Sequence, residues 1–508
     1  MDSILLSALI FSPLVGIIVL LFVPKNEEMV IKTVGLLATL LPLALAIIVY
    51  VGFDKAKEAL QFAEQYNWIN FHIPGLPNGN DFTISYDLGV SGLTVLLLLL
   101  TAVVSTLAAA ASVWIKAEWK GYFMLFLLLE IGMLGVFASQ NLLLFFIFFE
   151  ITLIPTFFLI GRWGYLDKEK AAYSFLIYNG LGSAILLIVF IILFMKAGTM
   201  NFTGLSAYLS QPPEMLERMY IGENFRLGLL IALLVALGVK LPIVPLHTWM
   251  LQVHVQAPPS IVMIHSGILL KIGAYGLYQF GMGFFPGEFD KIAFWIALLG
   301  VINLLYGAFI AFVQIDFKKV LAYSSVSHMG IVLIGLASLN EVGVQGAMFQ
   351  VISHGLISAL LFFLVGLIYQ RTGTSLITHL GGLSKVMPIT AGFLLAGGLA
   401  SLGLPGMSGF VSEFMAFLGL FKEEPVLAAI GTLGIILTAV YILRAVLTIT
   451  FGETKETLVS IKEGRFVEWL PALILTAFII LIGVYPAVLS DLLHLTINAM
   501  MAGKGASV

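Results

Sequence analysis

Long hydrophobic runs recur along almost the whole chain, and short polar segments separate them. A helix needs about 20 apolar residues to cross the hydrocarbon core of a bilayer, and these runs reach that length. They are too long, and alternate too little, to be strands of a membrane barrel. The pattern therefore predicts about fourteen spanning helices, at residues 3–23, 30–50, 88–114, 121–138, 141–161, 171–196, 226–250, 258–282, 290–314, 319–338, 343–370, 388–421, 425–451 and 469–497.

The polar segments between these runs predict smaller elements. Residues 54–86 contain Pro, Gly and Asn followed by the alternating stretch FTISY, which is typical of a small hairpin outside the membrane. The loop 198–224 is expected to include a short interfacial helix, and 452–468 to form an amphipathic surface segment. The first run lacks a basic start and a small-residue cleavage site, so we expect it to be a retained helix.

Two of the predicted helices are interrupted. The first break is at VKLPIVP, which includes Lys240, and the second is at LGLPGMSG, shortly before Glu413. Proline removes a helical hydrogen bond, and broken backbone at membrane depth is tolerated only inside protein or beside a wet cavity. Two such helices at corresponding places are typical of inverted repeats in transporters. The expected organisation is an N-terminal segment 1–119, a first repeat 120–285, a second, inverted repeat 286–452, and a C-terminal segment 453–508.

The composition supports an all-α polytopic membrane protein. The chain has 508 residues, of which 60% are hydrophobic and 10% charged, whereas a soluble domain carries about 25% charged residues. The net charge of −3 gives no sign of nucleic-acid binding. The sequence has no cysteine, which excludes iron–sulfur ligation by this chain. It also has no phosphate loop, dinucleotide fingerprint or metal-ligand spacing, so we expect no cofactor here.

Basic residues predict the orientation, because loops rich in Lys and Arg stay in the cytoplasm. Fifteen of them follow odd-numbered predicted helices, and eight lie in the other loops and the C-terminus. This places both termini outside. Lys318 and Lys319 belong to the cytoplasmic group, and we expect them to be surface anchors with a lesser role in proton uptake.

Several ionisable side chains lie within the predicted spanning helices, at membrane depth. A lysine or glutamate at the centre of a bilayer costs roughly 3 kcal/mol, so such residues usually mark functional pathways. Histidine titrates near neutral pH, which suits a proton relay. For one residue alone the alternatives are a lysine that reaches the headgroups or a histidine that bonds a neighbouring helix. The line of candidates, with serines and tyrosines beside its histidines, is Glu150, Lys240, Lys271, His328, His354 and Glu413. His265 lies on the same predicted helix as Lys271, but the two are six residues apart and do not share one tight face.

Glu150 and Lys240 are the expected switch. Their mutual attraction would offset the burial of both charges, and the balance would depend on their separation. His247 and His254 are seven residues apart, but the sequence offers no carboxylate or third histidine nearby, so we do not expect a metal site there.

Several motifs together resemble the antiporter-like membrane subunits of respiratory complex I. The resemblance implies fourteen helices with two inverted five-helix repeats, discontinuous helices seven and twelve, and one proton channel of two half-channels joined by a polar axis. It covers helices four to thirteen well. The motifs are FFEITLIPTFFLIGRWG, GVKLPIVPLHTWMLQVHVQAPPSIVMIHSGILLKIGAYGL, DFKKVLAYSSVSHMG, VISHGLISALLFFLVG and GLPGMSGFVSEF.

The resemblance also implies roles for single residues. Glu150 matches the family's helix-five glutamate, Lys240 its helix-seven lysine and Lys271 its connecting lysine on helix eight. His328 and His354 match histidines of the polar axis. Glu413 matches the residue of the output half, where a glutamate is typical of the M-type branch and a lysine of the L-type branch and of sodium/proton antiporters.

We therefore predict a proton-translocating subunit of an NADH–quinone oxidoreductase in the bacterial inner membrane. Flavin, iron–sulfur clusters and quinone would lie in partner subunits, which include other membrane subunits and homologous antiporter-like chains. One alternative is the D-type subunit of a multisubunit Na⁺/H⁺ antiporter. Another is a membrane subunit of a hydrogenase or of a ferredoxin-driven complex. A purely structural scaffold would explain none of the buried charges.

Overall fold

The computed structural model describes residues 4–72, 81–212, 215 and 219–504, and most of them are helical. Within this part of the chain, twelve helices are long and apolar enough to cross a membrane. They are α1 (Leu5–Phe22), α2 (Glu28–Gly52), α3 (Gly92–Ala111, continued by a short 3₁₀ turn), α4 (Trp119–Ala138), α5 (Leu142–Trp163), α6 (Lys168–Ala197), the continuous segment Pro259–Met282 that starts with α11 (Pro259–Ile264), α13 (Pro286–Val313), α14 (Phe317–Ala337), α15 (Glu341–Thr372), α19 (Pro425–Thr450) and α20 (Phe466–Val484).

Two further spans are interrupted at the predicted places. The first consists of α9 (Glu223–Lys240) and α10 (Thr248–Gln256), and the second of α17 (Pro388–Ser401) and α18 (Ser408–Glu423). With each interrupted pair counted as one, the described residues contain the fourteen spans that the hydrophobic pattern predicts. The fold class is therefore confirmed.

The prediction of one last helix at 469–497 is wrong. α20 ends at Val484, and a separate helix, α21 (Ala487–Ala499), follows. Pro486 is the residue before α21. Because proline has no N–H and disfavours a helical conformation in the residue before it, the first helix cannot continue through this position. The polar linker ahead of α20, predicted to be an amphipathic surface segment, contains one 3₁₀ turn, Glu456–Leu458.

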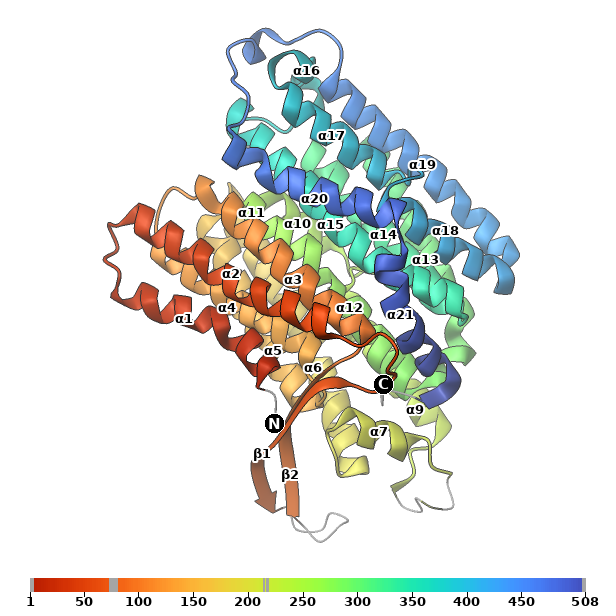
Figure 1. Ribbon diagram of the computed structural model, residues 1–508. Coiled ribbons are helices and arrows are strands. Elements are labelled where there is room, and N and C mark those ends of the chain that lie inside the picture. The colour runs from red at the N-terminus through yellow and green to blue at the C-terminus, as the bar shows by residue number, and fades with distance from the viewer. Residues whose placement is uncertain (1–3, 73–80, 213–214, 216–218, 505–508) are drawn as a thin grey trace.

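The hairpin and the short helix outside the bundle are present. β1 (Gln61–His72) pairs with β2 (Asp81–Val90) in antiparallel fashion, and its predicted tip at 73–80 lies outside the described residues. β2 continues to Val90, so α3 begins later than predicted. The loop between α6 and α9 contains α7 (Phe202–Leu209). Figure 1 shows the hairpin, α7 and α21 at one end of the bundle.

The hairpin also closes the start of α1. The Glu64 carboxylate is buried, and its Oε1 accepts hydrogen bonds from the backbone N–H groups of Leu6 at 2.7 Å and Ser7 at 3.2 Å. These N–H groups have no partner inside the helix, because they belong to its first turn.

We expect Glu64→Ala to weaken the start of α1 by about 1 to 2 kcal/mol, which is the usual effect of removing a side-chain cap. Hydrogen–deuterium exchange of α1 in the purified protein should become faster. The control is Gln65→Ala, because Gln65 is the neighbouring exposed residue of the same strand. Equal exchange in the two variants would contradict the capping role.

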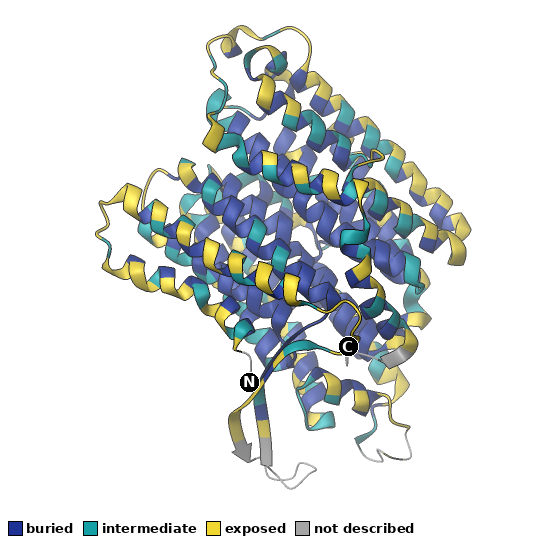
Figure 2. Cartoon of the chain, in the orientation of Figure 1, coloured by how far each residue is buried: buried dark blue, intermediate teal, exposed yellow. Residues whose placement is uncertain are grey.

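The core of the molecule lies where its two halves meet. α1 to α6 form one group of helices and α13 to α20 form the other (Figure 1), and α15 of the second group contacts α3 and α11. α15 and the segment Pro259–Met282 are buried along their membrane-spanning length, whereas α1 and α2 are largely exposed on the outside of the bundle. Figure 2 shows the same contrast between a buried centre and exposed outer helices. Side chains on α15 and Pro259–Met282 therefore pack mainly against other parts of the protein.

Candidate functional site

The first break positions Lys240 and is itself held by α13. α9 ends at Lys240 because Pro242 and Pro245 follow, and neither has an N–H for a helical hydrogen bond. Asn303 satisfies the freed backbone: its Oδ1 accepts from the N–H of Val244 at 2.6 Å, and its Nδ2 donates to the carbonyl of Pro242 at 3.4 Å. The break is thus buried in protein, as irregular backbone at membrane depth requires.

Lys240 is buried against aromatic rings. Its side chain is 2% exposed, and its Nζ lies 4.8 Å from the ring centre of Phe149 and 5.7 Å from that of Phe175. The negative faces of aromatic rings attract an ammonium group, most strongly where water is excluded. These two rings therefore hold the Lys240 ammonium away from lipid.

Glu150 stands near Lys240 without touching it. It follows Phe149 on α5, and the two charges interact electrostatically, but no direct ion pair joins them among the described residues. Glu150 is partly buried, and its Oε1 has no hydrogen-bond partner in the described part of the chain. The pair predicted from the sequence is therefore a separated one in this structure.

A histidine pair follows the break, and sequence reasoning missed it. His254 on α10 and His265 on the next span are both buried, and His254 Nε2 lies 2.9 Å from His265 Nδ1. The His265 ring lies 6.0 Å from that of Phe175, which also faces Lys240. Pro258 and Pro259 lie between the two histidines and turn the chain there. This turn brings the two rings together although they belong to different helices. That proline pair was the available signal.

Lys271 lies at the centre of the protein and contacts His354. Its side chain is fully buried, and its Nζ lies 2.6 Å from Nδ1 of His354 on α15. The His354 ring centre is in turn 5.3 Å from that of His328 on α14. A π-helical turn, His265–Leu269, precedes Lys271. π-turns inside α-helices frequently occur at functional sites, because the extra residue redirects the side chains that follow.

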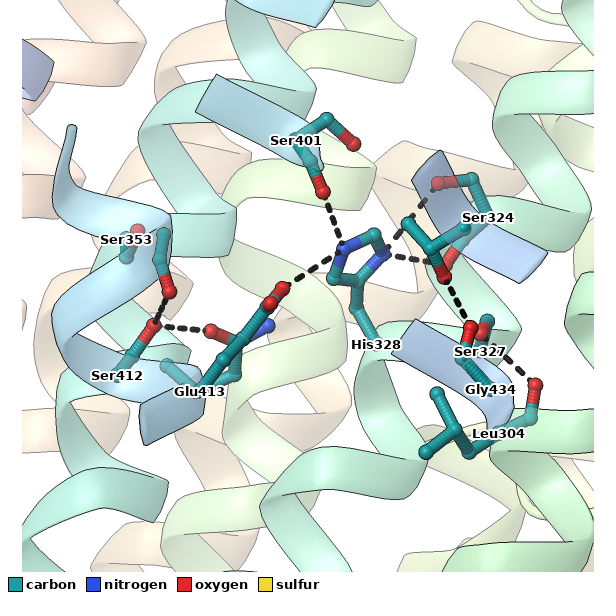
Figure 3. Close-up of polar contacts among 12 residues, drawn as sticks. Leu304, Ser324, Ser327, His328, Ser353, Ser401, Ser412, Glu413 and Gly434 are labelled. Carbon is teal, nitrogen blue, oxygen red and sulfur yellow. Dashed lines mark hydrogen bonds and ion pairs between the residues drawn. The ribbon is translucent and has the colours of Figure 1, made fainter. Parts of the chain in front are cut away.

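His328 bridges two helices with oxygen atoms on both sides (Figure 3). Its Nδ1 lies 2.8 Å from the carbonyl oxygen of Ser324, and its Nε2 lies 3.0 Å from that of Ser401. Nε2 is also 3.5 Å from Oε1 of Glu413. Only the doubly protonated ring can donate from both nitrogens, so this arrangement suits an imidazolium facing a carboxylate.

The second break creates this arrangement. α17 ends at Ser401, which leaves its carbonyl free to accept from His328. Gly403 adopts φ +77°, a left-handed conformation that glycine reaches without a steric penalty. A Cβ at Gly403 would lie 2.6 Å from Oε2 of Glu413, so the carboxylate would have to move if this residue carried a side chain.

The hydroxyl groups around the histidines are less connected than the sequence indicates. Ser324 Oγ lies 3.3 Å from His328 Nδ1 and accepts from the Tyr441 hydroxyl at 2.9 Å. The Ser353 and Ser408 hydroxyls are 2.7 Å apart. Three other serines donate to backbone carbonyls instead: Ser325, Ser327 and Ser358.

Two further buried ionisable residues change the sequence-based picture. Lys318, expected to be a surface anchor, is buried with its Nζ 3.9 Å from the ring centres of both Tyr165 and Tyr369. Glu130 on α4, which was not singled out, is fully buried, and neither of its carboxyl oxygens has a hydrogen-bond partner in the described part of the chain. Its position within the apolar run LFLLLEIGMLG was the available signal.

Comparison with known proteins gives a consistent result. Residues 139–485 match the family described as "NADH:quinone oxidoreductase/Mrp antiporter, TM". The chain is 36% identical to NADH-quinone oxidoreductase subunit M of Rhodobacter capsulatus over 496 residues, which cover 96% of this chain and 94% of that relative.

Solved structures give the same picture for the fold. A chain of respiratory complex I from Thermus thermophilus, solved with bound NADH, matches with a TM-score of 0.86 and 28% identity, covering 98% of this chain and 100% of that one. A chain of the Mrp complex from Dietzia sp. matches with a TM-score of 0.83 and covers 98% of both chains, but at 22% identity it shows a shared fold alone.

Proposed function

Because this chain belongs to the membrane-subunit family of NADH:quinone oxidoreductases and Mrp antiporters, we propose that it conducts protons along its buried Lys, His and Glu side chains. Its function is that of a proton-translocating membrane subunit of an NADH–quinone oxidoreductase, as the sequence predicts. The oxidoreductase relative from Rhodobacter capsulatus is 36% identical to this chain, whereas the chain of the Mrp complex is 22% identical over a similar length, which favours this function over that of a Na⁺/H⁺ antiporter subunit.

The observation that supports the proposed path is a line of buried ionisable groups joining the two breaks. From Lys240 the line passes Phe175 to the His265–His254 pair. His254 interacts electrostatically with Lys271. The remaining steps are the contacts of Lys271 with His354, of His354 with His328, and of His328 with Glu413.

The separated Glu150–Lys240 pair suits a switch. Two unit charges 4 Å apart attract by roughly 4 kcal/mol at an effective dielectric constant of about 20, and the attraction falls as they separate. A charge change in a neighbouring subunit that moves Glu150 toward or away from Lys240 would alter how firmly Lys240 holds its proton. Lys240 would then pass the proton through the histidines and Lys271 to Glu413, which exchanges it with the outside.

The wider organisation follows the same proposal. Residues 120–285 would form the input half and 286–452 the inverted output half, with the segments 1–119 and 453–508 at the ends. Both termini would face outside the bacterial inner membrane. Redox chemistry would take place on flavin, iron–sulfur clusters and quinone in partner subunits, and this chain would contribute a proton path to the translocase without a redox centre of its own.

Ion dependence in vesicles tests the proposed function. Inverted membrane vesicles that contain the intact complex should acidify when NADH is added, at a rate that does not depend on sodium. Acidification that requires sodium would favour an antiporter subunit instead. Copurification of the intact complex and identification of its partner chains would give an independent answer.

His265→Phe is expected to slow NADH-driven acidification several-fold. The phenyl ring keeps the packing against Trp249 and Phe175 but removes the nitrogen that faces His254. Acidification is measured relative to electron transfer from NADH to an artificial acceptor, which reports the amount of assembled complex. His379→Phe, at an exposed histidine outside the line, is the matched control. An unchanged rate in His265→Phe would remove the histidine pair from the path.

A further inference from the structure

A groove opens on the outer face of the bundle between α1, α4 and α5, away from the proton path. It has a volume of about 810 Å³, which lies within the range of sites that hold small molecules. No side chain of the proposed relay lines it. Its walls are mostly apolar, and the residues that form them are Leu14, Ile17, Met124, Leu125, Leu128 and Phe158.

The length of the groove along the helices is close to the thickness of one lipid leaflet. Its charged end includes Lys120, in the first turn of α4, and its apolar wall reaches Leu128 on the same helix. Eight residues of helix span roughly 12 Å, and half of the hydrocarbon core is about 15 Å thick. Leu14 and Phe158 are exposed within the groove, so an occupant would cover apolar surface over most of one leaflet.

The charged end carries an excess of positive charge. Three basic residues line it, Lys25, Lys120 and Arg162, against one acidic residue, Glu118. The hydrogen bond from Arg162, and then the charges of Lys168 and Lys25, lower the pKa of Glu118, so its carboxylate stays ionised at neutral pH. The net charge of these four groups is therefore +2.

The positive groups are held at the level of the lipid headgroups. Lys120 donates from Nζ to the carbonyl oxygens of Leu21 at 2.9 Å and Val23 at 3.0 Å, at the C-terminal end of α1. Arg162 donates from Nη2 to Glu118 at 2.6 Å. Trp163 lines the same end, and tryptophan is enriched at the membrane–water interface. Lys25 is exposed and free to approach a headgroup.

We propose that this groove binds one anionic phospholipid, with its phosphate near Lys25 and Arg162 and its acyl chains against Leu125 and Leu128. Charge and depth together identify this occupant. A free phosphate would leave the apolar wall uncovered, and an apolar helix of a neighbouring subunit would leave the net charge of +2 without a counter-charge. The proposal is independent of the proton path and would stand if that path were disproved.

A charge series tests the headgroup contact. The intact complex is placed in phosphatidylcholine vesicles that contain a minor share of phosphatidylglycerol, re-extracted in mild detergent, and its bound phosphatidylglycerol is measured. Lys25→Gln lowers the net charge of the groove and should reduce retention several-fold, whereas Glu118→Gln raises that charge and should increase retention. Arg444→Gln, at an exposed arginine on α19, should match the unmodified complex. Equal retention in all the variants would overturn the proposal.

A crosslink identifies the occupant directly. Leu125 is replaced by the photoreactive residue benzoylphenylalanine in the complex in the same vesicles, and Ile188 on the exposed outer face of α6 is replaced likewise as a control. Illumination should attach mainly phosphatidylglycerol at position 125, and both lipids in their bulk proportion at position 188. A protein adduct at 125 would assign the groove to a neighbouring subunit, and lipid adducts in bulk proportion would show an unselective surface. Either result overturns the proposal.

Discussion

Lys240→Ala should lower NADH-driven proton translocation by about tenfold or more, which corresponds to at least about 1.4 kcal/mol in the barrier of the slowest step. Lys240 is buried at the end of α9 and is held by the rings of Phe149 and Phe175. Alanine removes the protonatable group between Glu150 and the histidine pair. The measurement is the initial rate of acidification in inverted vesicles relative to NADH oxidation by an artificial acceptor. Glu150→Ala should have a similar effect.

Lys240→Arg separates proton transfer from a purely electrostatic role. Arginine keeps a positive charge against the same rings, but it does not release its proton in proteins. If Lys240 carries protons, Lys240→Arg should fail as Lys240→Ala does. If Lys240 only balances charge, arginine should restore translocation.

The matched control for Lys240 is Lys291→Ala. Lys291 forms an exposed ion pair with Glu223 at 2.8 Å, and such pairs contribute about 0 to 1 kcal/mol. This variant should translocate protons normally. Normal proton stoichiometry in Lys240→Ala itself would disprove the proposed path.

Glu413→Gln should have the second-largest effect, and it should lower both the rate of proton translocation and the stability of the complex. Glutamine has nearly the same shape but cannot take up the proton that Glu413 would release to the outside, so translocation should fall by about tenfold or more. It also removes the carboxylate that faces His328 at 3.5 Å. Breaking a buried ion pair from one side costs about 3 to 5 kcal/mol, so the thermal unfolding temperature of the complex should fall as well.

Two variants on α18 serve as controls for Glu413. Glu413→Asp keeps a carboxylate and should retain part of the translocation rate. Glu423→Gln removes a carboxylate at the exposed end of the same helix and should leave the rate unchanged. A Glu413→Gln complex that is less stable but translocates normally would show that the His328–Glu413 contact is structural.

The hydrophobic pattern predicted most of the helices because a bilayer demands apolar runs of one length. It also predicted both breaks, because proline and glycine within an apolar run interrupt the helix whatever the run packs against. The helix predicted at 469–497 was wrong, although Pro486 within it indicated a break. The residues on both sides of Pro486 are apolar, so the hydrophobic pattern predicted one continuous helix. In the protein the helix ends before Pro486, because proline has no N–H for a helical hydrogen bond.

Contacts between helices could not be predicted from the sequence in the same way. The sequence places Lys271 and His354 on different helices, and nothing in either helix predicts that their nitrogens lie 2.6 Å apart. The His254–His265 pair depends on the turn at Pro258 and Pro259. The burial of Lys318 depends on Tyr165 and Tyr369, which come from distant parts of the chain. Glu130 was visible in the sequence as an isolated carboxyl, but only packing shows that it lacks a hydrogen-bond partner among the described residues.

The sequence by itself determined the class of protein, the position of nearly every helix, both breaks and the ionisable residues at membrane depth. These properties follow from local chemistry, because hydropathy, helix propensity and the cost of burying a charge belong to each segment alone. Only the tertiary structure decided which of those residues touch, that Glu150 and Lys240 stand apart, and that α1, α4 and α5 enclose a groove with a positive end. Such distances are set by how helices far apart in the chain pack against one another.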